Sequence, residues 1–425
     1  MAEEASQEWV ERLRAMRRQP TSDAPLCGGL SDLPALRFFS AEAAALQGRF
    51  PELPARRARW EGRGTRRVID GRSCLTFSSY DYLGLSGHPE VADAVNEALA
   101  RHGASVSASR LAGGNLREHL ELENELAAML GTEEALVMIS GYGTNVALLG
   151  HLTDPHTLVL HDEWIHNSVL TGIRLSGAHA QPFAHNDWDD LERRLERDKA
   201  RYRMALIVVE GVYSMDGDIP DLPRLLAIKK RHGGSLMVDE AHSLGVLGRR
   251  GFGLGEHCGL VNRDGVDLWM GTLSKTYAGS GGFVAGSRAL IDYLRWTAPG
   301  HVFSVGLSPP ATASALAALR IHRREPERVE RLRQLSSWFR EQASRHGLPV
   351  ARAPGAIVPL MIGDDARAMT LALRLFEEGI DVQPVVHPVV APGTARLRFF
   401  ITSEHTREEI AWAVERVSRL CHQMS

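Results

Sequence analysis

The sequence predicts an α/β protein whose main domain is built on a large, mostly parallel sheet. Its 425 residues are enough for two or three domains around a large buried core. From about residue 75 to about residue 310, short apolar runs alternate with amphipathic stretches, which is typical of strands that alternate with helices. The strand-like runs include EALVMI, TLVLH, ALIVVEG, SLMVDEA and DLWMGT, and the helix-like stretches include REHLELENELAAML and DLPRLLAIKKRH.

The segments on either side of this region have a different character, and we expect three parts: 1–70, 71–315 and 316–425. Residues 1–70 form an N-terminal extension, largely Arg-rich and helical. Asp70-Gly71 predicts a hairpin turn between two short strands. Beyond the large domain, long helices lead into a smaller α+β domain with the strands IVPLMIG and LRFFIT and a final helix from about Arg407.

Composition and charge exclude several classes of protein. The formal net charge is -3, without the basic excess typical of proteins that bind nucleic acid. No secretory signal and no run of about 18 apolar residues is present, so we expect no transmembrane segment. The four cysteines form no CxxC pair, which argues against a zinc site or a disulfide framework. Together these features favour a cytoplasmic enzyme.

The chemistry is predicted by a lysine and a carboxylate that each follow a strand-like run. Lys275 lies in TLSKT before a glycine-rich loop, where an amine can form a Schiff base with an aldehyde cofactor. Asp239 ends the run SLMV, and the carboxyl ends of parallel strands face the ligand crevice. A carboxylate there can keep a pyridinium nitrogen protonated, and His242 is close enough to reach the same ring. Taken alone, each residue has a simpler interpretation. Lys275 is then an ordinary surface lysine in a loop, and Asp239 is then the cap of a helix.

Two further motifs favour a phosphate-bearing ring. In SGYGTN, the amides of Gly141 and Tyr142 open a helix and can bind an anion, although a simple turn and cap has the same pattern. In HDEWIHNS, His166 can stack on a ring. His161, Asp162 and His166 also suggest a metal cluster. The sequence has no motif that would supply the other ligands of a zinc site, so we expect no metal.

The four residues DEAH, from Asp239 to His242, also match the magnesium-binding box of a helicase family. That interpretation requires a GxxxxGK[ST] loop on an earlier strand, and the sequence contains none. A nucleic-acid-dependent ATPase is therefore disfavoured.

With these motifs in this order, the chain resembles the α-oxoamine synthases, a branch of the fold-type I pyridoxal 5'-phosphate (PLP) transferases. The resemblance runs from about Phe77 to His405. It rests on SSYDYLGLSGHP, SGYGTN, HDEWIHNSVLTGIRLSGA, AHND, VVEGVYSMDGD, DEAHSLGVLGRRGFG, GTLSKT, GLSPP and GTARLR.

The resemblance implies PLP as cofactor and a set of residue roles. Lys275 holds the cofactor and moves the α-proton, Asp239 binds the pyridine nitrogen, and His166 stacks on the ring. His242 and Ser214 lie near the phenolic oxygen. The phosphate is bound by Thr272 with the Gly141 and Tyr142 amides, and Arg398 holds the carboxylate of the amino acid.

Three departures from the family pattern bear on substrate and assembly. Tyr80 replaces a common asparagine, as in serine palmitoyltransferases, which favours serine or alanine. Val386 replaces an arginine of some members, so carboxylate binding depends on Arg398, with His387 as a helper. Ser304 is retained beside Val305, and in relatives this segment reaches the phosphate of the neighbouring subunit, so we expect a homodimer.

We therefore expect an acyltransferase that condenses a small L-amino acid with an acyl thioester and releases carbon dioxide, most like serine palmitoyltransferase. Aminooxononanoate synthase-like and aminolevulinate synthase-like activities, and a biosynthetic enzyme that off-loads a carrier protein, stay open. The acyl donor is coenzyme A or an acyl carrier protein. Residues 1–70 either bind a carrier protein or cover the dimer, and the second role is slightly favoured. The rival from another class is a non-catalytic partner subunit, and an aminotransferase or aldolase shares the cofactor residues.

Overall fold

The structure is a computed structural model that describes residues 57–260 and 265–425, apart from 352, 388 and 425, together with residues 29–33 and 36. The predicted helical character and carrier-protein role of the N-terminal extension fall mostly outside the described residues. Within them, η1 spans Leu30–Asp32.

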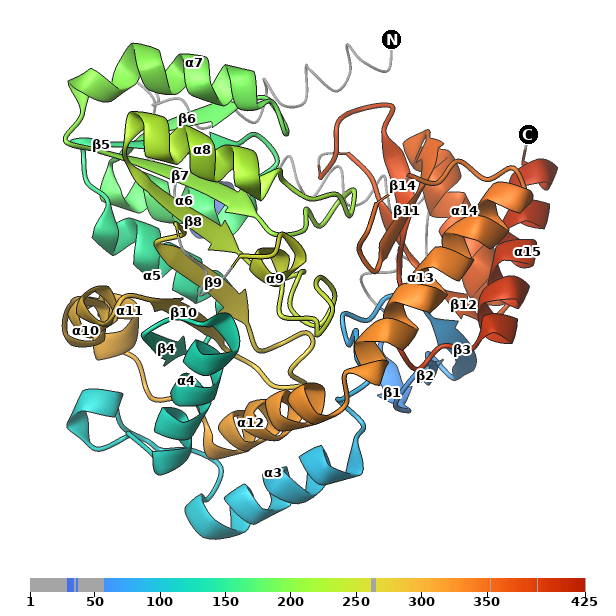
Figure 1. The fold of residues 1–425 in the computed structure, drawn as a ribbon. Helices are drawn as coiled ribbons and strands as arrows, with labels where there is room; N and C mark the ends of the chain where they lie inside the picture. Colours follow the sequence, from blue (N-terminus) through green and yellow to red (C-terminus); the bar gives the residue numbers. More distant parts are fainter. Residues whose placement is uncertain are drawn as a thin grey trace.

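The large domain is built on a seven-stranded sheet (Figure 1). Across the sheet the strands are β4 (Glu134–Met138), β10 (Gly282–Gly286), β9 (Leu268–Thr272), β8 (Ser235–Asp239), β7 (Met204–Glu210), β5 (Thr157–Asp162) and β6 (His179–Phe183). The five strands from β9 to β6 are parallel to one another, and β10 is antiparallel to both its neighbours. The predicted α/β class with a mostly parallel sheet is thus confirmed.

Helices cover both faces of this sheet, and this is why its strands are almost continuously apolar. Along β5, Leu158 and Leu160 belong to one buried cluster, while Val159 belongs to the cluster on the opposite face. One face packs on α4 (Arg117–Leu130), α7 (Trp188–Asp198) and α8 (Leu222–His232), and the other on α5 (Gly141–Leu152), α6 (Asn167–Ser176) and α10 (Arg288–Thr297).

The C-terminal domain is a three-stranded antiparallel sheet with helices against it. Its strands in sheet order are β11 (Ile357–Gly363), β14 (Ala395–Phe400) and β13 (Gln383–Val385), and its helices are α13 (Glu327–Arg345), α14 (Asp365–Glu377) and α15 (Arg407–Gln423). The last helix begins at Arg407 as predicted, because Thr406 and Glu409 form a capping box.

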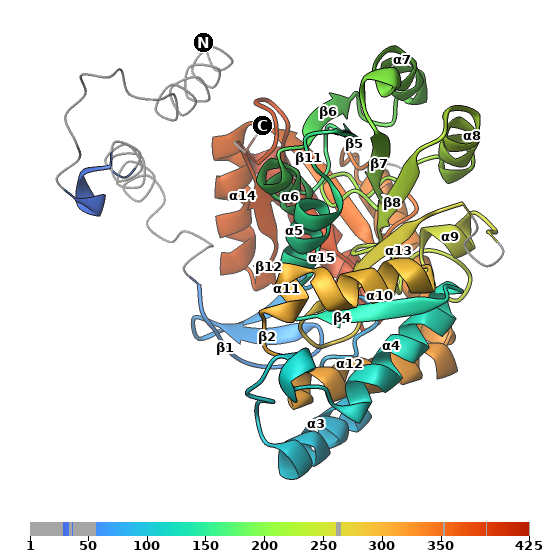
Figure 2. The same cartoon turned by 90° about the vertical axis from the view of Figure 1, so that its left-hand side faces the viewer.

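The hairpin predicted at Asp70-Gly71 is present, and both turn residues have the positive φ values, 46° and 77°, that a tight hairpin requires. It joins β2 (Arg66–Ile69) to β3 (Arg72–Thr76), and β1 (Arg59–Glu61) and β12 (Ile380–Asp381) complete a second sheet in the order β1-β2-β3-β12. The boundary expected at residue 70 cuts this hairpin. A division that follows the sheets places Arg59–Thr76 with the C-terminal domain, as Figure 2 also shows.

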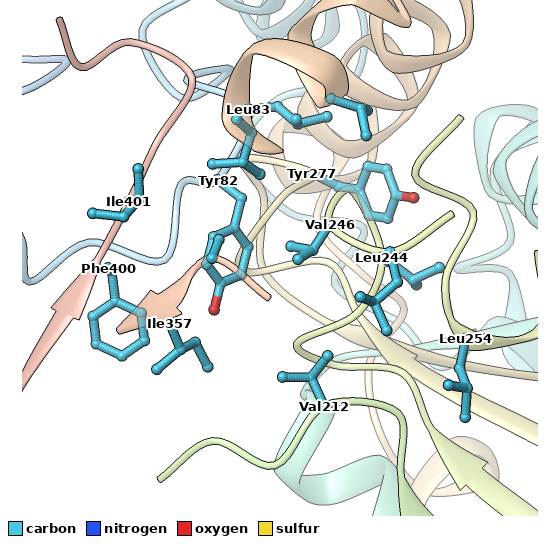
Figure 3. Packing of buried hydrophobic residues seen from close by; sticks show 14 of the residues in the cluster. Tyr82, Leu83, Val212, Leu244, Val246, Leu254, Tyr277, Ile357, Phe400 and Ile401 are labelled. Atoms are coloured by element: carbon cyan, nitrogen blue, oxygen red, sulfur yellow. The ribbon is translucent and has the colours of Figure 1, made fainter. Parts of the chain in front are cut away.

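Apolar residues of the two domains belong to one continuous buried cluster. Figure 3 shows Tyr82 beside Phe400 and Ile357 of the small domain, with Val212 and Leu244 of the large domain in the same cluster. The remaining helices are α3 (Pro89–His102), which packs on α12 (Pro309–Arg324), and the short η3 (Arg110–Ala112), η4 (Lys199–Arg201), α9 (Leu254–His257) and α11 (Pro299–Val302). Among the residues described, no helix combines the length and apolar character needed to span a membrane.

Candidate active site

The chemistry-bearing residues gather at the carboxyl ends of three adjacent strands. Glu210, Asp239 and Thr272 are the last residues of β7, β8 and β9, and Lys275 follows β9 by three residues. Because these strands are parallel neighbours, their ends lie at one edge of the sheet, where open α/β sheets bind ligands.

Lys275 lies in a half-buried position that makes its amine reactive. Burial lowers the pKa of Lys275 to about 8, although the nearby Asp239 opposes this effect. The Nζ atom is 5.6 Å from the centre of the Tyr80 ring. A substantial fraction of this amine is therefore neutral near physiological pH and available as a nucleophile.

Asp239 is connected to His166 by a chain of hydrogen bonds through Asn145 and Ser168. Asn145 Nδ2 donates to Asp239 Oδ2 at 2.8 Å and to Ser168 Oγ at 2.9 Å, and Ser168 Oγ is 2.6 Å from His166 Nδ1. Asn145 and Ser168 are buried. Sequence reasoning missed Asn145, although it ends the SGYGTN motif one helical turn after Gly141, on the side of α5 that faces the sheet.

Glu210 is a second carboxylate that sequence reasoning missed. It pairs in register with Asp239 on the neighbouring strand and accepts a hydrogen bond from the backbone N–H of His166. Burial and the nearby charge of Asp239 raise the pKa of Glu210 to about 8, so this group is protonated at neutral pH. One negative charge is thereby left at the strand ends. The sequence signal that could have identified Glu210 is its position at the end of a strand-like apolar run, as for Asp239.

His242 is held by two tyrosines from the segment after β3. The Tyr82 hydroxyl is 2.7 Å from His242 Nδ1, and the Tyr80 ring meets the imidazole edge-on with centroids 5.6 Å apart. Burial and the nearby Lys275 lower the pKa of His242 well below its usual value. His242 is therefore a neutral donor or acceptor, and Tyr82 determines which way its ring faces.

The start of α5 and the end of β9 form a tight cradle. A Cβ atom on Gly141 would lie 2.7 Å from Thr272 Oγ1, and one on Gly282 would lie 2.7 Å from the Gly141 Cα. Thr272 Oγ1 is also 2.8 Å from Ser274 Oγ. Amides at a helix start beside two hydroxyls make a site suited to a phosphate. Tyr142 adds its amide, and its ring lies edge-on to His166 at 6.2 Å.

Arg398 reaches the same site from β14 of the small domain. Its Nη1 donates to the backbone oxygen of Ser214 at 2.9 Å, and its Nη2 lies 3.5 Å from the Tyr80 hydroxyl. The guanidinium also stacks over Phe400 at 4.8 Å. Its Nε is buried without a hydrogen-bond partner in the part of the chain that the structure describes. A carboxylate ligand supplies the acceptor that this donor lacks.

Two further predicted residues lie outside the helices and strands. His387 lies in a turn beyond the end of β13, and its backbone N–H donates to Asp365. Ser304 lies between the exposed Phe303 and Val305, in a segment that bridges to Ser109.

The three residues that suggested a metal cluster, His161, Asp162 and His166, each contact different groups. His161 Nδ1 is 2.8 Å from the backbone oxygen of Asp162, and the Asp162 carboxylate is 2.9 Å from His185 Nδ1. His166 belongs to the Ser168 contact instead. Glu240 of the DEAH string accepts the Leu254 backbone N–H, so it organises the start of α9.

His185 forms a charged cluster beside the site. Its two ring nitrogens lie 2.9 Å from Asp162 and 2.7 Å from Asp218, and the Trp164 indole stacks on the ring at 3.7 Å. Burial opposes the charge, but the hydrogen bonds to both carboxylates raise the pKa of His185 to about 9. Asp218 ends the loop that carries Ser214, so this cluster fixes the loop against which Arg398 binds.

These residues fit PLP. An amine of lowered pKa matches the aldehyde, a buried carboxylate at the facing strand end matches the pyridine nitrogen, and the Gly141 and Thr272 cradle matches the phosphate. The cofactor-bearing region thus has each donor that PLP requires.

Comparisons with known proteins agree. Residues 72–417 match the aminotransferase class I and II family. The 8-amino-7-oxononanoate synthase 1 of Bacillus velezensis is 40% identical over 347 residues, which cover 82% of this chain and 88% of that protein. The serine palmitoyltransferase of Bacteroides ovatus is 37% identical over 354 residues, covering 83% and 89%. A solved structure of Sphingomonas wittichii serine palmitoyltransferase superposes with a TM-score of 0.89 at 29% identity, covering 93% of this chain and 99% of that one.

Fold and site together define a fold-type I PLP-dependent enzyme. The match covers most of the chain, and the named relatives narrow the class further. The chain belongs to the class I and II aminotransferase family and, within it, to the α-oxoamine synthases, which are PLP-dependent acyltransferases. The family resemblance and the cofactor expected from the sequence are confirmed.

Proposed function

We propose that this enzyme condenses a small L-amino acid with an acyl thioester, with loss of carbon dioxide, to give an α-amino ketone. The observation that carries this proposal is that Arg398, with its unpartnered Nε, lies beside Tyr80 on the side of the site that faces Lys275. An amine for the cofactor and a cation for an amino-acid carboxylate are thus found in one site.

Different residues of the chain act in different steps of the proposed reaction. PLP, when bound, stabilises negative charge that develops at the amino-acid α-carbon. Lys275 accepts and returns the α-proton, since burial brings its pKa to about 8. Asp239 keeps the ring nitrogen protonated, and Asn145 holds the carboxylate in place. Arg398 would orient the carboxylate that leaves as carbon dioxide, and His166, held by Ser168, would contact the cofactor ring.

Serine or alanine is the preferred amino acid in this proposal. Tyr80 lies edge-on to His242 and near Arg398, so its ring takes up space beside the proposed carboxylate site. A small side chain fits beside it. The aminotransferase alternative uses the same cofactor residues, and only the product separates the two reactions.

We also propose a homodimer in which Ser304 reaches the cofactor phosphate of the partner subunit. Ser304 is flanked by Phe303 and Val305, whose side chains are 86% and 52% exposed. Apolar side chains so exposed favour burial against a second chain. Sedimentation of the holoprotein at decreasing concentration tests this, and a fully active monomer would refute it.

The decisive experiment identifies the product. The purified holoprotein is incubated with L-serine, L-alanine or glycine and an acyl thioester, and the product is identified by mass together with released carbon dioxide. Lys275→Ala is expected to abolish turnover, and borohydride reduction of the unaltered protein is expected to trap the cofactor on Lys275. Amino-group transfer to a keto acid at a comparable rate would instead establish an aminotransferase.

A further inference from the structure

A pocket of about 400 Å³ leads from Lys275 to the surface beside the N-terminal hairpin. It is lined on one side by Lys275, Ser274 and Tyr80, and on the other by residues of β1 and β2 and the turn between them. A substrate that reacts at Lys275 and extends outward through this pocket must pass along the hairpin.

The hairpin side of the pocket is strongly cationic. Arg59, Arg63 and Arg67 line it, and the side chains of Arg59 and Arg63 are exposed. Arg67 is half-buried, and its Nη2 donates to Ser79 Oγ at 3.0 Å. The Nε of Arg67 is buried and has no hydrogen-bond partner within the described chain. A donor of this kind beside two further guanidinium groups indicates an anionic ligand.

The carboxylates nearby accept hydrogen bonds from other donors. Asp81 lines the same pocket, but its oxygens accept hydrogen bonds from the backbone N–H groups of Leu85 and Ser86 and from the Ser86 hydroxyl. Asp381 accepts from the Thr76 hydroxyl at 2.7 Å. Burial and the positive charge of Arg59 lower the pKa of Arg67, although the charges of Asp81 and Asp381 oppose this effect.

We propose that Arg59, Arg63 and Arg67 bind the phosphate of the 4'-phosphopantetheine arm through which the acyl thioester is delivered. The inference rests on the proposed function, because it requires a thioester substrate at Lys275. Coenzyme A and an acyl carrier protein share this phosphate, and the planar guanidinium group matches its oxygens in a bidentate manner. The arm lies in the pocket with the sulfur toward Lys275 and the phosphate at the arginines.

Arg66, in the same hairpin at the start of β2, provides a charge-matched control. Successive strand residues point to opposite faces, and Arg66 points away from the pocket to Glu409 of α15, at 3.3 Å. Arg66→Ala therefore changes the net charge by the same amount but removes no residue that lines the pocket.

The first test measures binding without turnover. Calorimetric titration of the holoprotein with coenzyme A is expected to give a dissociation constant roughly three- to tenfold higher for Arg59→Ala and for Arg63→Ala. Arg66→Ala is expected to bind as the unaltered protein does, and pantetheine, which has no phosphate, is expected to bind equally to all four. Unchanged affinity for coenzyme A in both pocket variants, or an equal loss for pantetheine, would overturn the proposal. Circular dichroism and cofactor absorbance confirm that each variant is folded.

The second test identifies the source of the phosphate. The KM values of the unaltered protein and of the arginine variants are compared for an acyl-coenzyme A, an acylated carrier protein and an acyl pantetheine. A KM that rises in the variants only for the acyl-coenzyme A identifies coenzyme A as the donor. A KM that rises only for the acylated carrier protein identifies the carrier protein. Product formation with no effect of the arginines would refute the phosphate site and leave the proposed function intact. Arginine-dependent binding of coenzyme A without any condensation product would support the phosphate site and refute the proposed function.

Discussion

The charge on His185 should make the stability of the protein depend on pH. The folded-state pKa of His185, about 9, lies above its ordinary value of 6.5, because Asp162 and Asp218 both bind the ring. Protonation therefore stabilises the fold fully below pH 6.5, and this contribution is lost as pH rises through 9. It is roughly 3 kcal/mol at pH 6 and falls below about 1 kcal/mol at pH 9.

His185→Gln measures this contribution directly. Urea unfolding of the holoprotein is followed by tryptophan fluorescence at pH 6, 7, 8 and 9 for the unaltered chain and the variant. The difference in their free energies of unfolding is expected to shrink by roughly 2 to 3 kcal/mol over this range. The exposed His156 provides the control, since His156→Gln is expected to change stability by less than about 0.5 kcal/mol at each pH. A difference for His185→Gln that does not change with pH would show that the ring is not charged in the folded protein.

Three substitutions test the cofactor and substrate contacts. Asn145→Leu removes two donated hydrogen bonds at similar volume, so the free energy of unfolding of the apoprotein falls by roughly 2 to 4 kcal/mol; an unchanged urea midpoint would contradict this. Gly141→Ala places a methyl group 2.7 Å from Thr272 Oγ1, so cofactor affinity, measured by absorbance titration, falls about tenfold, and retained affinity would remove Gly141 from the phosphate site. Arg398→Lys keeps the charge but loses the planar fork, so KM for the amino acid rises about tenfold while kcat changes less; the reverse pattern would place Arg398 in the chemical step.

Local patterns in the sequence were enough to predict the elements that carry the cofactor residues. The apolar run that ends at Asp239 is a buried strand, and Lys275 follows the next strand of the sheet, as the motif spacing indicates. The Asp70-Gly71 turn was predictable because its two positive φ values require these residue types. The partners of these groups were not predictable. Glu210 ends a strand, which is a local signal, but its pairing with Asp239 on the neighbouring strand leaves none, and Tyr82 contacts His242 across 160 residues.

The sequence by itself determined the fold class and the cofactor, because both follow from short motifs whose spacing sets their own local geometry. Tertiary structure alone decided which carboxylate is charged, since the pKa of Glu210 depends on burial beside Asp239 on the neighbouring strand. It also decided that the hairpin arginines and Arg398, more than 300 residues apart, lie on opposite sides of Tyr80, within reach of Lys275. Electrostatic interactions depend on distance in space and on burial, which a linear pattern does not encode.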